Sequence, residues 1–401
     1  MPRLLSFPIA VATGLLPLLA GCGPRDINAA ARWNGTIDTL ESGTVAVTNP
    51  ETGAWREGDA WTVAEELRIG IVDGEGPDLF GSITALEVDP AGRIYVLEGQ
   101  AQELRVFDAT GAHVRTMGRE GGGPGEFARA LKLDWGADGN LWIADPQNNR
   151  FSLFDTAGTF VGSHQAPGGF IIIPWPGRID DQGYLYGPVP LQGETAFRMG
   201  LVRYDQDLEP MDTVTPPDFP GRAEYFEVRN EQGHMRAGVP FSPGLTWHIE
   251  RSGTIWAMLT GEYKLFELTL AGDTLRTITR AFTPVPVTEA DVDSAMVNFE
   301  WFIRQGGKVD RSRFPSEKPA TREFSLDDEG NIWVLPITEN LADERRLFEV
   351  FDPVGRYLGR VRLPFDLARR PVPVFRDGMI YGATEDDLEV PFVIRARITK
   401  P

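Results

Sequence analysis

The feature that most constrains the fold is a short motif that recurs along the chain. In each copy a turn glycine is followed by one residue, then an aliphatic and then an aromatic residue, as in Gly139-Asn140-Leu141-Trp142. This order is typical of a tight turn that leads into a buried β-strand. Six copies are present, and their glycines are Gly92, Gly139, Gly183, Gly253, Gly330 and Gly378.

The spacing of the copies predicts the repeat unit. Three of the intervals between the glycines are 44 to 48 residues long, and the other two are 70 and 77. An alternating strand precedes each turn, and a second hairpin follows it, often ending in Asp-x-x-Gly as at 108–111. A period of about 40–50 residues with four strands is that of a propeller blade. The sequence therefore predicts an all-β, six-bladed β-propeller of four-stranded blades.

The first predicted strand of the ring has no blade before it. Residues 67–71 and the glycine-rich connection at 73–80 match the pattern of the outer strand at 112–117 and its connection at 121–127. We therefore expect the N-terminal strand to complete the last blade, which closes the ring and removes its open edges.

The N-terminus reads as a bacterial secretory signal. Arg3 precedes an apolar stretch, which ends in Leu19-Ala20-Gly21-Cys22. These four residues resemble a lipobox, which implies cleavage before Cys22 and attachment of lipid to that cysteine, the only one in the chain. An ordinary signal peptide with an incidental cysteine is the alternative. Gly23 in place of Asp favours the outer membrane, facing the periplasm or the cell surface.

The expected organisation has four parts. Residues 1–21 form the lipoprotein signal peptide, 22–34 a tether, 35–66 a peripheral N-terminal hairpin and 67–401 the propeller. The net charge of −19, without a basic run, excludes nucleic acid as a partner. A single cysteine permits no internal disulfide, and we expect a monomer attached to the membrane through its lipid.

Two long intervals interrupt the repeat, at residues 205–247 and 281–322. The second contains one predicted short helix near 288–304, with Thr288 as its cap and an apolar face of Val292, Met296, Phe299 and Ile303. Such insertions serve either as binding loops or as covers over a blade edge.

The glycine-rich connection Gly121–Phe127, the strand that ends at Asp145 and the following Asn148-Asn149-Arg150 together resemble an NHL repeat. More broadly, the chain is similar to six-bladed propeller lipoproteins of the NHL-repeat and TolB-like group. The resemblance implies six blades, and it implies that Asp145, Asn149 and Arg150 tie neighbouring blades together by hydrogen bonds.

Candidate ligand or metal residues lie where second strands end. Glu98, Asp145, Asn148 and Asn149 are expected at the mouth of the central channel, where oxygen ligands could hold calcium as in propeller lactonases. The structural role in joining blades is the competing interpretation. The four histidines show no metal-binding spacing, and no nucleophile elbow is present.

Two function classes remain open. The missing catalytic signature favours a non-catalytic, lipid-anchored binding module for a peptide, glycan or envelope protein, without a cofactor. The alternative is a lyase, lactonase or other hydrolase with a divalent metal such as calcium in the channel. Amidating-type lyases, which the NHL resemblance includes, depend on several channel histidines that this chain lacks. A purely structural spacer is a third interpretation.

Overall fold

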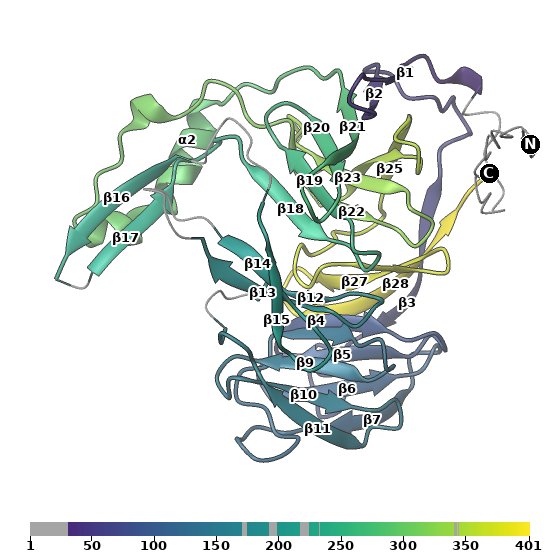
Figure 1. The fold of residues 1–401 in the computed structure, drawn as a ribbon, viewed down its shortest axis with the longest axis vertical. Coiled ribbons are helices and arrows are strands. Elements are labelled where there is room, and N and C mark those ends of the chain that lie inside the picture. The colour runs from purple at the N-terminus through teal and green to yellow at the C-terminus, as the bar shows by residue number, and fades with distance from the viewer. Residues whose placement is uncertain are drawn as a thin grey trace, which may run out of the picture.

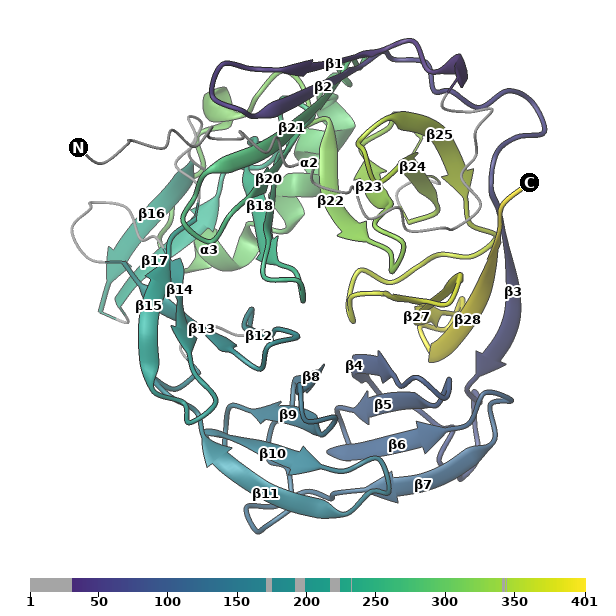
Figure 2. The ribbon, with the colours of Figure 1, turned by 45° about the vertical axis from the view of Figure 1, so that its right-hand side comes forward.

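The computed structural model describes residues 31–170, 175–191, 199–216, 224–231, 233–340, 343 and 345–401. The predicted signal peptide and Cys22 lie outside these residues. Six sheets, each with four antiparallel propeller strands, stand around a central axis with their first strands innermost, and the N-terminal hairpin adds two strands to one of them (Figure 2). The structure is a six-bladed β-propeller, as the motif spacing predicted.

The first three blades follow one another without a change of order. Blade 1 consists of β4 (Ile83–Val88), β5 (Ile94–Glu98), β6 (Glu103–Phe107) and β7 (His113–Met117). Blade 2 consists of β8 (Lys132–Trp135), β9 (Leu141–Asp145), β10 (Arg150–Phe154) and β11 (Phe160–Gln165). Blade 3 consists of β12 (Arg178–Ile179), β13 (Leu185–Pro190), β14 (Met199–Tyr204) and β15 (Pro210–Val214).

The last three blades complete the circle. Blade 4 consists of β18 (Leu245–Ile249), β19 (Ile255–Leu259), β20 (Lys264–Leu268) and β21 (Thr274–Arg280). Blade 5 consists of β22 (Thr321–Leu326), β23 (Ile332–Pro336), β24 (Leu347–Phe351) and β25 (Tyr357–Arg362). Blade 6 consists of β26 (Val374–Arg376), β27 (Met379–Glu385), β28 (Pro391–Thr399) and β3 (Thr62–Ile69).

Strand β3 comes from the N-terminal side of the ring and pairs antiparallel with the C-terminal β28, from Thr62 opposite Thr399 to Ile69 opposite Val393. The two chain ends of the propeller thus share one sheet (Figure 1). The expected boundary between residues 66 and 67 falls inside β3, so the propeller begins five residues earlier than the motif comparison placed it.

The N-terminal hairpin extends blade 4. Strands β1 (Thr36–Thr39) and β2 (Val45–Asn49) turn at Gly43, whose φ is 86°, and β2 runs parallel to β21 at the outer edge. Asn49 accepts from the backbone N–H of Tyr357 at 2.6 Å and donates to the carbonyl of Gly355 at 2.9 Å. The hairpin therefore fastens blade 4 to blade 5. Among the described residues, no helix is both long enough and apolar enough to cross a membrane.

The core is divided among the blade interfaces. Six clusters of buried apolar side chains each join two neighbouring blades. Strand β5 illustrates the cause, because all five of its residues are buried and its two faces pack against different blades. Strands buried on both faces carry continuous apolar runs, which explains why the motif is so apolar after its glycine.

The turn motif contains an acidic residue that latches it to the following strand. Asp89 accepts a hydrogen bond from the hydroxyl of Tyr95 at 3.2 Å. The same contact joins Asp180 to Tyr186 at 2.9 Å and Asp327 to the indole N–H of Trp333 at 3.1 Å. Burial and the nearby Asp89 raise the pKa of Tyr95 to about 12. The latch gives the aromatic residue a polar partner in blades 1, 3 and 5.

Blade 2 departs from this pattern. Gly136 stands where blades 1, 3 and 5 have the aspartate of the latch, and the buried indole N–H of Trp142 has no partner among the described residues.

The two insertions fold together beside the ring (Figure 1). The first forms a hairpin of β16 (Tyr225–Asn230) and β17 (Gly233–Gly238). The second forms α2 (Glu289–Val297), α3 (Glu300–Arg304) and η1 (Arg311–Arg313). Phe226 of the hairpin packs edge-to-face on Phe299, at 5.7 Å between ring centroids. The insertions thus share a small core of their own.

The single helix expected over 288–304 is therefore two helices. Thr288 does cap the first, because its hydroxyl and Asp291 form a capping box. The chain bends between α2 and α3, where Phe299 turns into the insertion core. The expected apolar face is wrong in part: Phe299 is buried, whereas Ile303 is 45% exposed. The bend rotates the second helix away from the line of the first.

Candidate functional site

One level of the inner strands is polar in five of the six blades. In every blade, one inner-strand residue pairs across the sheet with the aromatic residue of the turn motif. These six residues, which we call the inner ring, are Glu87, Asp134, Arg178, His248, Ser325 and Val374. Because they share one position in the repeat, they lie at the same level of strands that surround the axis (Figure 2).

The adjacent level is apolar throughout. Its residues pair with the aliphatic residue of the motif, and they are Val88, Trp135, Ile179, Ile249, Leu326 and Phe375. Alternation along a strand places successive side chains on opposite faces. The polar side chains of the inner ring in blades 1 to 4 therefore lie on one face of each of those inner strands.

Glu87 is the most perturbed carboxyl group of the inner ring. Burial, and then the negative charge of Asp134, raise the pKa of Glu87 to about 7, against the attraction of Arg178, Arg251 and Lys132. Within the described part of the chain, its carboxyl group has no hydrogen-bond partner. Glu87 is therefore a group that exchanges its proton near neutral pH.

Asp134 is fully engaged by the protein. Its side chain is almost completely buried and accepts from the backbone N–H of Ile179 at 2.9 Å. Arg251, which lies in the turn after β18, reaches it at 3.2 Å and donates also to the carbonyl of Trp135 at 3.1 Å. A residue of blade 4 thereby contacts blade 2 past the two-residue inner strand of blade 3.

Lys132 lies two residues before Asp134 on β8. Its ammonium group donates to the carbonyl of Gly177 and lies 5.3 Å from the ring centroid of Trp175. Burial lowers the pKa of Lys132, against the attraction of Asp134. A positive charge is thus held beside the inner ring by a carbonyl and an aromatic face.

Arg178 and His248 meet at Glu250. The imidazole Nε2 of His248 lies 2.7 Å from one carboxylate oxygen of Glu250, and Nη1 of Arg178 lies 3.7 Å from the other. Burial opposes ionisation of Glu250, but the hydrogen bond with His248 holds its pKa below the ordinary value. The His248 ring stacks on Phe324 at 4.6 Å, which fixes its orientation.

Together these groups form a mixed-charge site on four neighbouring blades. Such a site can orient a small polar molecule, and Glu87 can give or take a proton there. Sequence reasoning missed it, although a signal was present: in five blades, the inner-ring residue stands five positions before the turn glycine. The alternation within one strand does not reveal the site, because its charged residues come from different blades.

The predicted residue Glu98 has a different role. Its side chain is 1% exposed and accepts from the backbone N–H groups of Gly81 and Ser82 at 3.0 and 2.9 Å, and from that of Ala101 at 2.5 Å. These amides belong to the connections that flank the strands of blade 1. The carboxylate oxygens of Glu98, which would be the metal ligands, therefore accept hydrogen bonds from backbone N–H groups instead.

Asp145 repeats this arrangement in blade 2. Its buried carboxylate accepts from the backbone N–H groups of Ala128 and Arg129, both at 2.9 Å, and from the side chain of Asn148 at 2.7 Å. Asn148 also donates to the carbonyl of Gly121 at 3.0 Å.

Asn149 has a φ of 50°, a turn conformation that asparagine tolerates. Its neighbour Arg150 donates to carbonyls of the glycine-rich connection, among them Glu126 at 3.0 Å. The contacts of Asp145, Asn148 and Arg150 therefore lie within blade 2 and its own entry connection. Among the described residues, no group of three or more His, Cys, Asp or Glu side chains is arranged to hold a metal ion.

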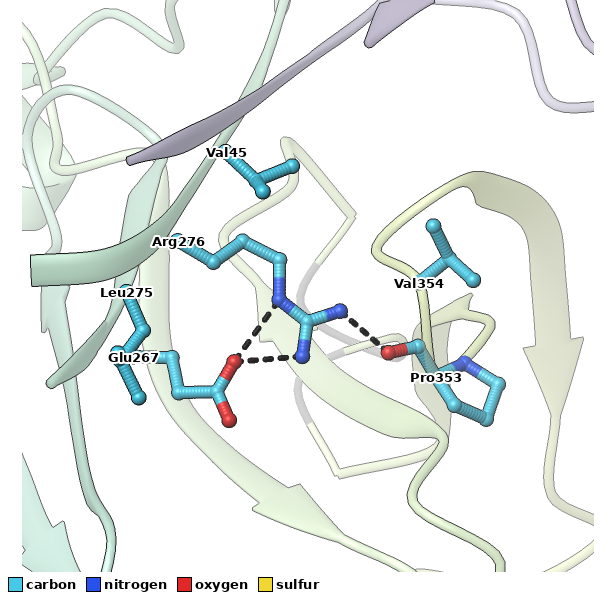
Figure 3. A pocket seen from close by; sticks show the side chains of 6 residues that line it. All are labelled: Val45, Glu267, Leu275, Arg276, Pro353 and Val354. Atoms are coloured by element: carbon cyan, nitrogen blue, oxygen red, sulfur yellow. Dashed lines mark hydrogen bonds and ion pairs between the residues drawn. The ribbon is translucent and has the colours of Figure 1, made fainter. Parts of the chain in front are cut away.

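A shallow pocket of about 370 Å³ lies at the periphery, between blades 4 and 5 (Figure 3). Arg276 crosses it, donating to Glu267 at 2.6 and 2.9 Å and to the carbonyl of Pro353. Leu275 and Val354 flank this ion pair. Because the charges of the pocket satisfy each other, the inner ring is the stronger candidate site.

Three solved structures resemble this chain at low sequence identity. A Bacteroides fragilis NCTC 9343 protein named as exported has 11% identity and a TM-score of 0.50, with 88% of this chain and 100% of that chain covered. Virginiamycin B lyase from Staphylococcus aureus has 10% identity and a TM-score of 0.41, with 85% and 100% covered. A gluconolactonase from Xanthomonas campestris has 10% identity and a TM-score of 0.42, with 80% and 88% covered.

No curated protein matches the sequence. At the identities above, the likeness extends to the fold alone. Residues 77–256, which run from the start of blade 1 into blade 4, match the family DUF5128, described as a 6-bladed beta-propeller.

Proposed function

We propose that this protein is a lipid-anchored propeller of the bacterial cell envelope that binds a small polar ligand at its inner ring. The observation that carries the proposal is that the inner-ring position brings the side chains of Glu87, Asp134, Arg178 and His248 to one level of four neighbouring blades, next to a level that is apolar in all six blades. A ring needs no charge there to pack, and burying charged groups has a free-energy cost. A role in ligand binding explains why charged residues are present there despite this cost.

The anchor rests on the sequence. The lipobox-like Leu19-Ala20-Gly21-Cys22 follows an apolar stretch, and the chain from Gly23 to the first hairpin is short enough to keep the propeller near the membrane. The outer membrane is the proposed location, with the propeller facing the periplasm or the cell surface.

The test is a thermal-shift screen of the domain from residue 23 onward with peptides, oligosaccharides and small organic acids. A true ligand raises the melting temperature in proportion to the logarithm of its concentration. We expect Arg178→Gln to remove that shift and Arg119→Gln, which changes an exposed arginine, to leave it intact. Ligands whose effect survives Arg178→Gln, or an absence of any ligand, would contradict the proposal.

Catalysis at the same site is the second candidate, and Glu87 favours it. A carboxyl group with a pKa of about 7 is suited to general acid–base work at neutral pH. A lyase or hydrolase function predicts that the ligand found in the screen is converted to product, detected by mass spectrometry. Glu87→Gln should then abolish turnover while binding persists. Recovery of the unchanged ligand after long incubation would leave binding alone.

A further inference from the structure

At the inner ring, the carboxylates and the cations have different kinds of hydrogen-bond partner. Both fixed carboxylates already have side-chain partners, since Arg251 reaches Asp134 at 3.2 Å and His248 reaches Glu250 at 2.7 Å. The cations Lys132 and Arg178 instead donate mainly to main-chain carbonyls, those of Gly177 and Ile249.

Arg178 has donors to spare. Its Nη1 atom makes the 3.1 Å hydrogen bond to Ile249 and lies 3.7 Å from Glu250, and no contact of its Nη2 or Nε atoms is formed among the described residues. Its side chain is 31% exposed. A guanidinium group presents its N–H donors in a planar fork that matches a carboxylate. The free side of Arg178 is therefore complementary to an anion.

Glu87 completes this complementarity. The charged groups that face it are Asp134 and Lys132 on β8, Arg178 on β12 and Arg251 in the turn after β18. A carboxyl group in its neutral form donates one O–H hydrogen bond, whereas a carboxylate only accepts. Below neutral pH, Glu87 thus offers a donor to an anion and no repelling charge.

We propose that the inner ring binds a small organic anion that presents a carboxylate, gripped by the fork of Arg178 and receiving a hydrogen bond from neutral Glu87. This inference rests on the proposed function and specifies its ligand class. Lys132 adds long-range attraction for an anion, since its positive charge acts on Glu87 in the same site. No covalent step is involved.

The inference carries a pH dependence. With the pKa of Glu87 at about 7, the neutral fraction falls from roughly 0.9 at about pH 6 to roughly 0.1 at about pH 8. If only the neutral form is competent, the apparent affinity falls by the same factor, about tenfold.

The test uses succinate and glutarate as probes, and succinamide as the uncharged control. We expect either dicarboxylate at about 10 mM to raise the melting temperature at about pH 6, and binding measured by calorimetry to weaken about tenfold by about pH 8. Succinamide should produce no shift. Arg178→Gln should weaken binding at least about tenfold.

Glu87→Gln is the discriminating variant. Its amide keeps an N–H donor but cannot ionise, so binding should persist and lose most of its pH dependence. A pH dependence that survives unchanged in this variant would overturn the role of Glu87.

Two further results would overturn the inference. One is the absence of a shift with both dicarboxylates, and the other is a shift that Arg178→Gln leaves intact. If a neutral peptide or sugar from the wider screen binds and needs Arg178, the proposed function stands and the anion inference fails. If nothing binds at the inner ring, both fail.

Discussion

Glu87 and Asp134 occupy the same position on neighbouring inner strands, each paired across its blade with the aromatic residue of the turn motif, Tyr95 and Trp142. Asp134 is tied to Arg251 and to a backbone amide, and its negative charge acts on Glu87. Two carboxyl groups in equivalent places thus have different surroundings, because among the described residues Asp134 accepts hydrogen bonds and Glu87 accepts none.

Folding stability should depend on pH through Glu87. Its folded-state pKa of about 7 lies above the ordinary value of 4.5, so the folded protein binds the proton more tightly than the unfolded chain. Stability from this group is therefore full below about pH 4.5 and is lost as pH rises to about 7, by roughly 1–3 kcal/mol.

The variant Glu87→Gln removes this loss. We expect it to melt higher than the wild type at about pH 8, where Glu87 is ionised, and close to it at about pH 5. Glu75→Gln, which changes an exposed carboxylate, is the control. A difference in melting temperature between Glu87→Gln and the wild type that stays constant across this pH range would contradict the assignment of the raised pKa to Glu87.

The acidic latch of the turn motif should contribute strongly to stability. Asp327→Ala removes the acceptor of the Trp333 indole and of the backbone N–H groups of Glu329 and Asn331. Because buried donors are left without partners, we expect a loss of about 2–4 kcal/mol in urea unfolding. Asp138→Ala, in the exposed turn of blade 2, should cost about 1 kcal/mol or less. Equal effects of the two changes would argue against the latch.

A buried ion pair between blades 4 and 5 gives a third prediction. Glu349 is 0% exposed, and it contacts Arg280 at 3.2 Å and Arg360 at 3.0 Å and accepts from the hydroxyl of Tyr263. Glu349→Gln leaves Arg280 buried without a carboxylate, so we expect a loss of roughly 3–5 kcal/mol in the free energy of unfolding.

The peripheral ion pair in Figure 3 is the matched comparison for Glu349. Glu267→Gln breaks the contact with Arg276, whose partially exposed charge water can solvate, and should cost only about 0–1 kcal/mol. The prediction is wrong if both substitutions have the same effect in denaturant titrations.

Asp145 should act as a structural residue rather than a metal ligand. Asp145→Ala leaves the backbone N–H groups of Ala128 and Arg129 without their acceptor, and we expect a loss of roughly 2–4 kcal/mol. Asn148→Ala removes its own hydrogen bonds but leaves those two amides satisfied, so its cost should be smaller. Calcium should not change the melting temperature of the wild type. A calcium-dependent rise that Asp145→Ala abolishes would restore the metal hypothesis.

The anchor is tested in cells. Cys22→Ser removes the thiol to which lipid would be attached, and we expect the protein to move from the membrane fraction to the soluble fraction, followed by immunoblot. Ser6→Ala, within the signal segment, is the control and should leave the distribution unchanged. Membrane association that persists in Cys22→Ser would refute the lipoprotein interpretation.

The sequence by itself determined the architecture. A turn glycine followed by an aliphatic and an aromatic residue marks the second strand of every blade, because only glycine takes the turn conformation readily and both strand faces are buried between blades. Six copies therefore predict six blades. The match of residues 67–71 to a later outer strand likewise pointed to the strand that pairs with β28, since side-chain patterns repeat where environments repeat.

Only the tertiary structure decided which polar residues form a site. Glu98 and Asp145 were singled out because carboxylates after buried strands can bind ligands, but such carboxylates serve equally well to satisfy backbone N–H groups, and the choice depends on where the connections of the same blade run. Glu87 and Arg178 were passed over because they are 91 positions apart in sequence.

Their common level follows from register and ring closure, which bring distant inner strands around one axis.

The same dependence on long-range packing limits the prediction of the insertions. Thr288 marks a helix start through local chemistry, whereas the bend before Phe302 depends on a hairpin that lies elsewhere in the sequence. Local motifs determine strands and turns, because their energies depend on neighbouring residues. A charge cluster assembled from four blades depends on long-range packing.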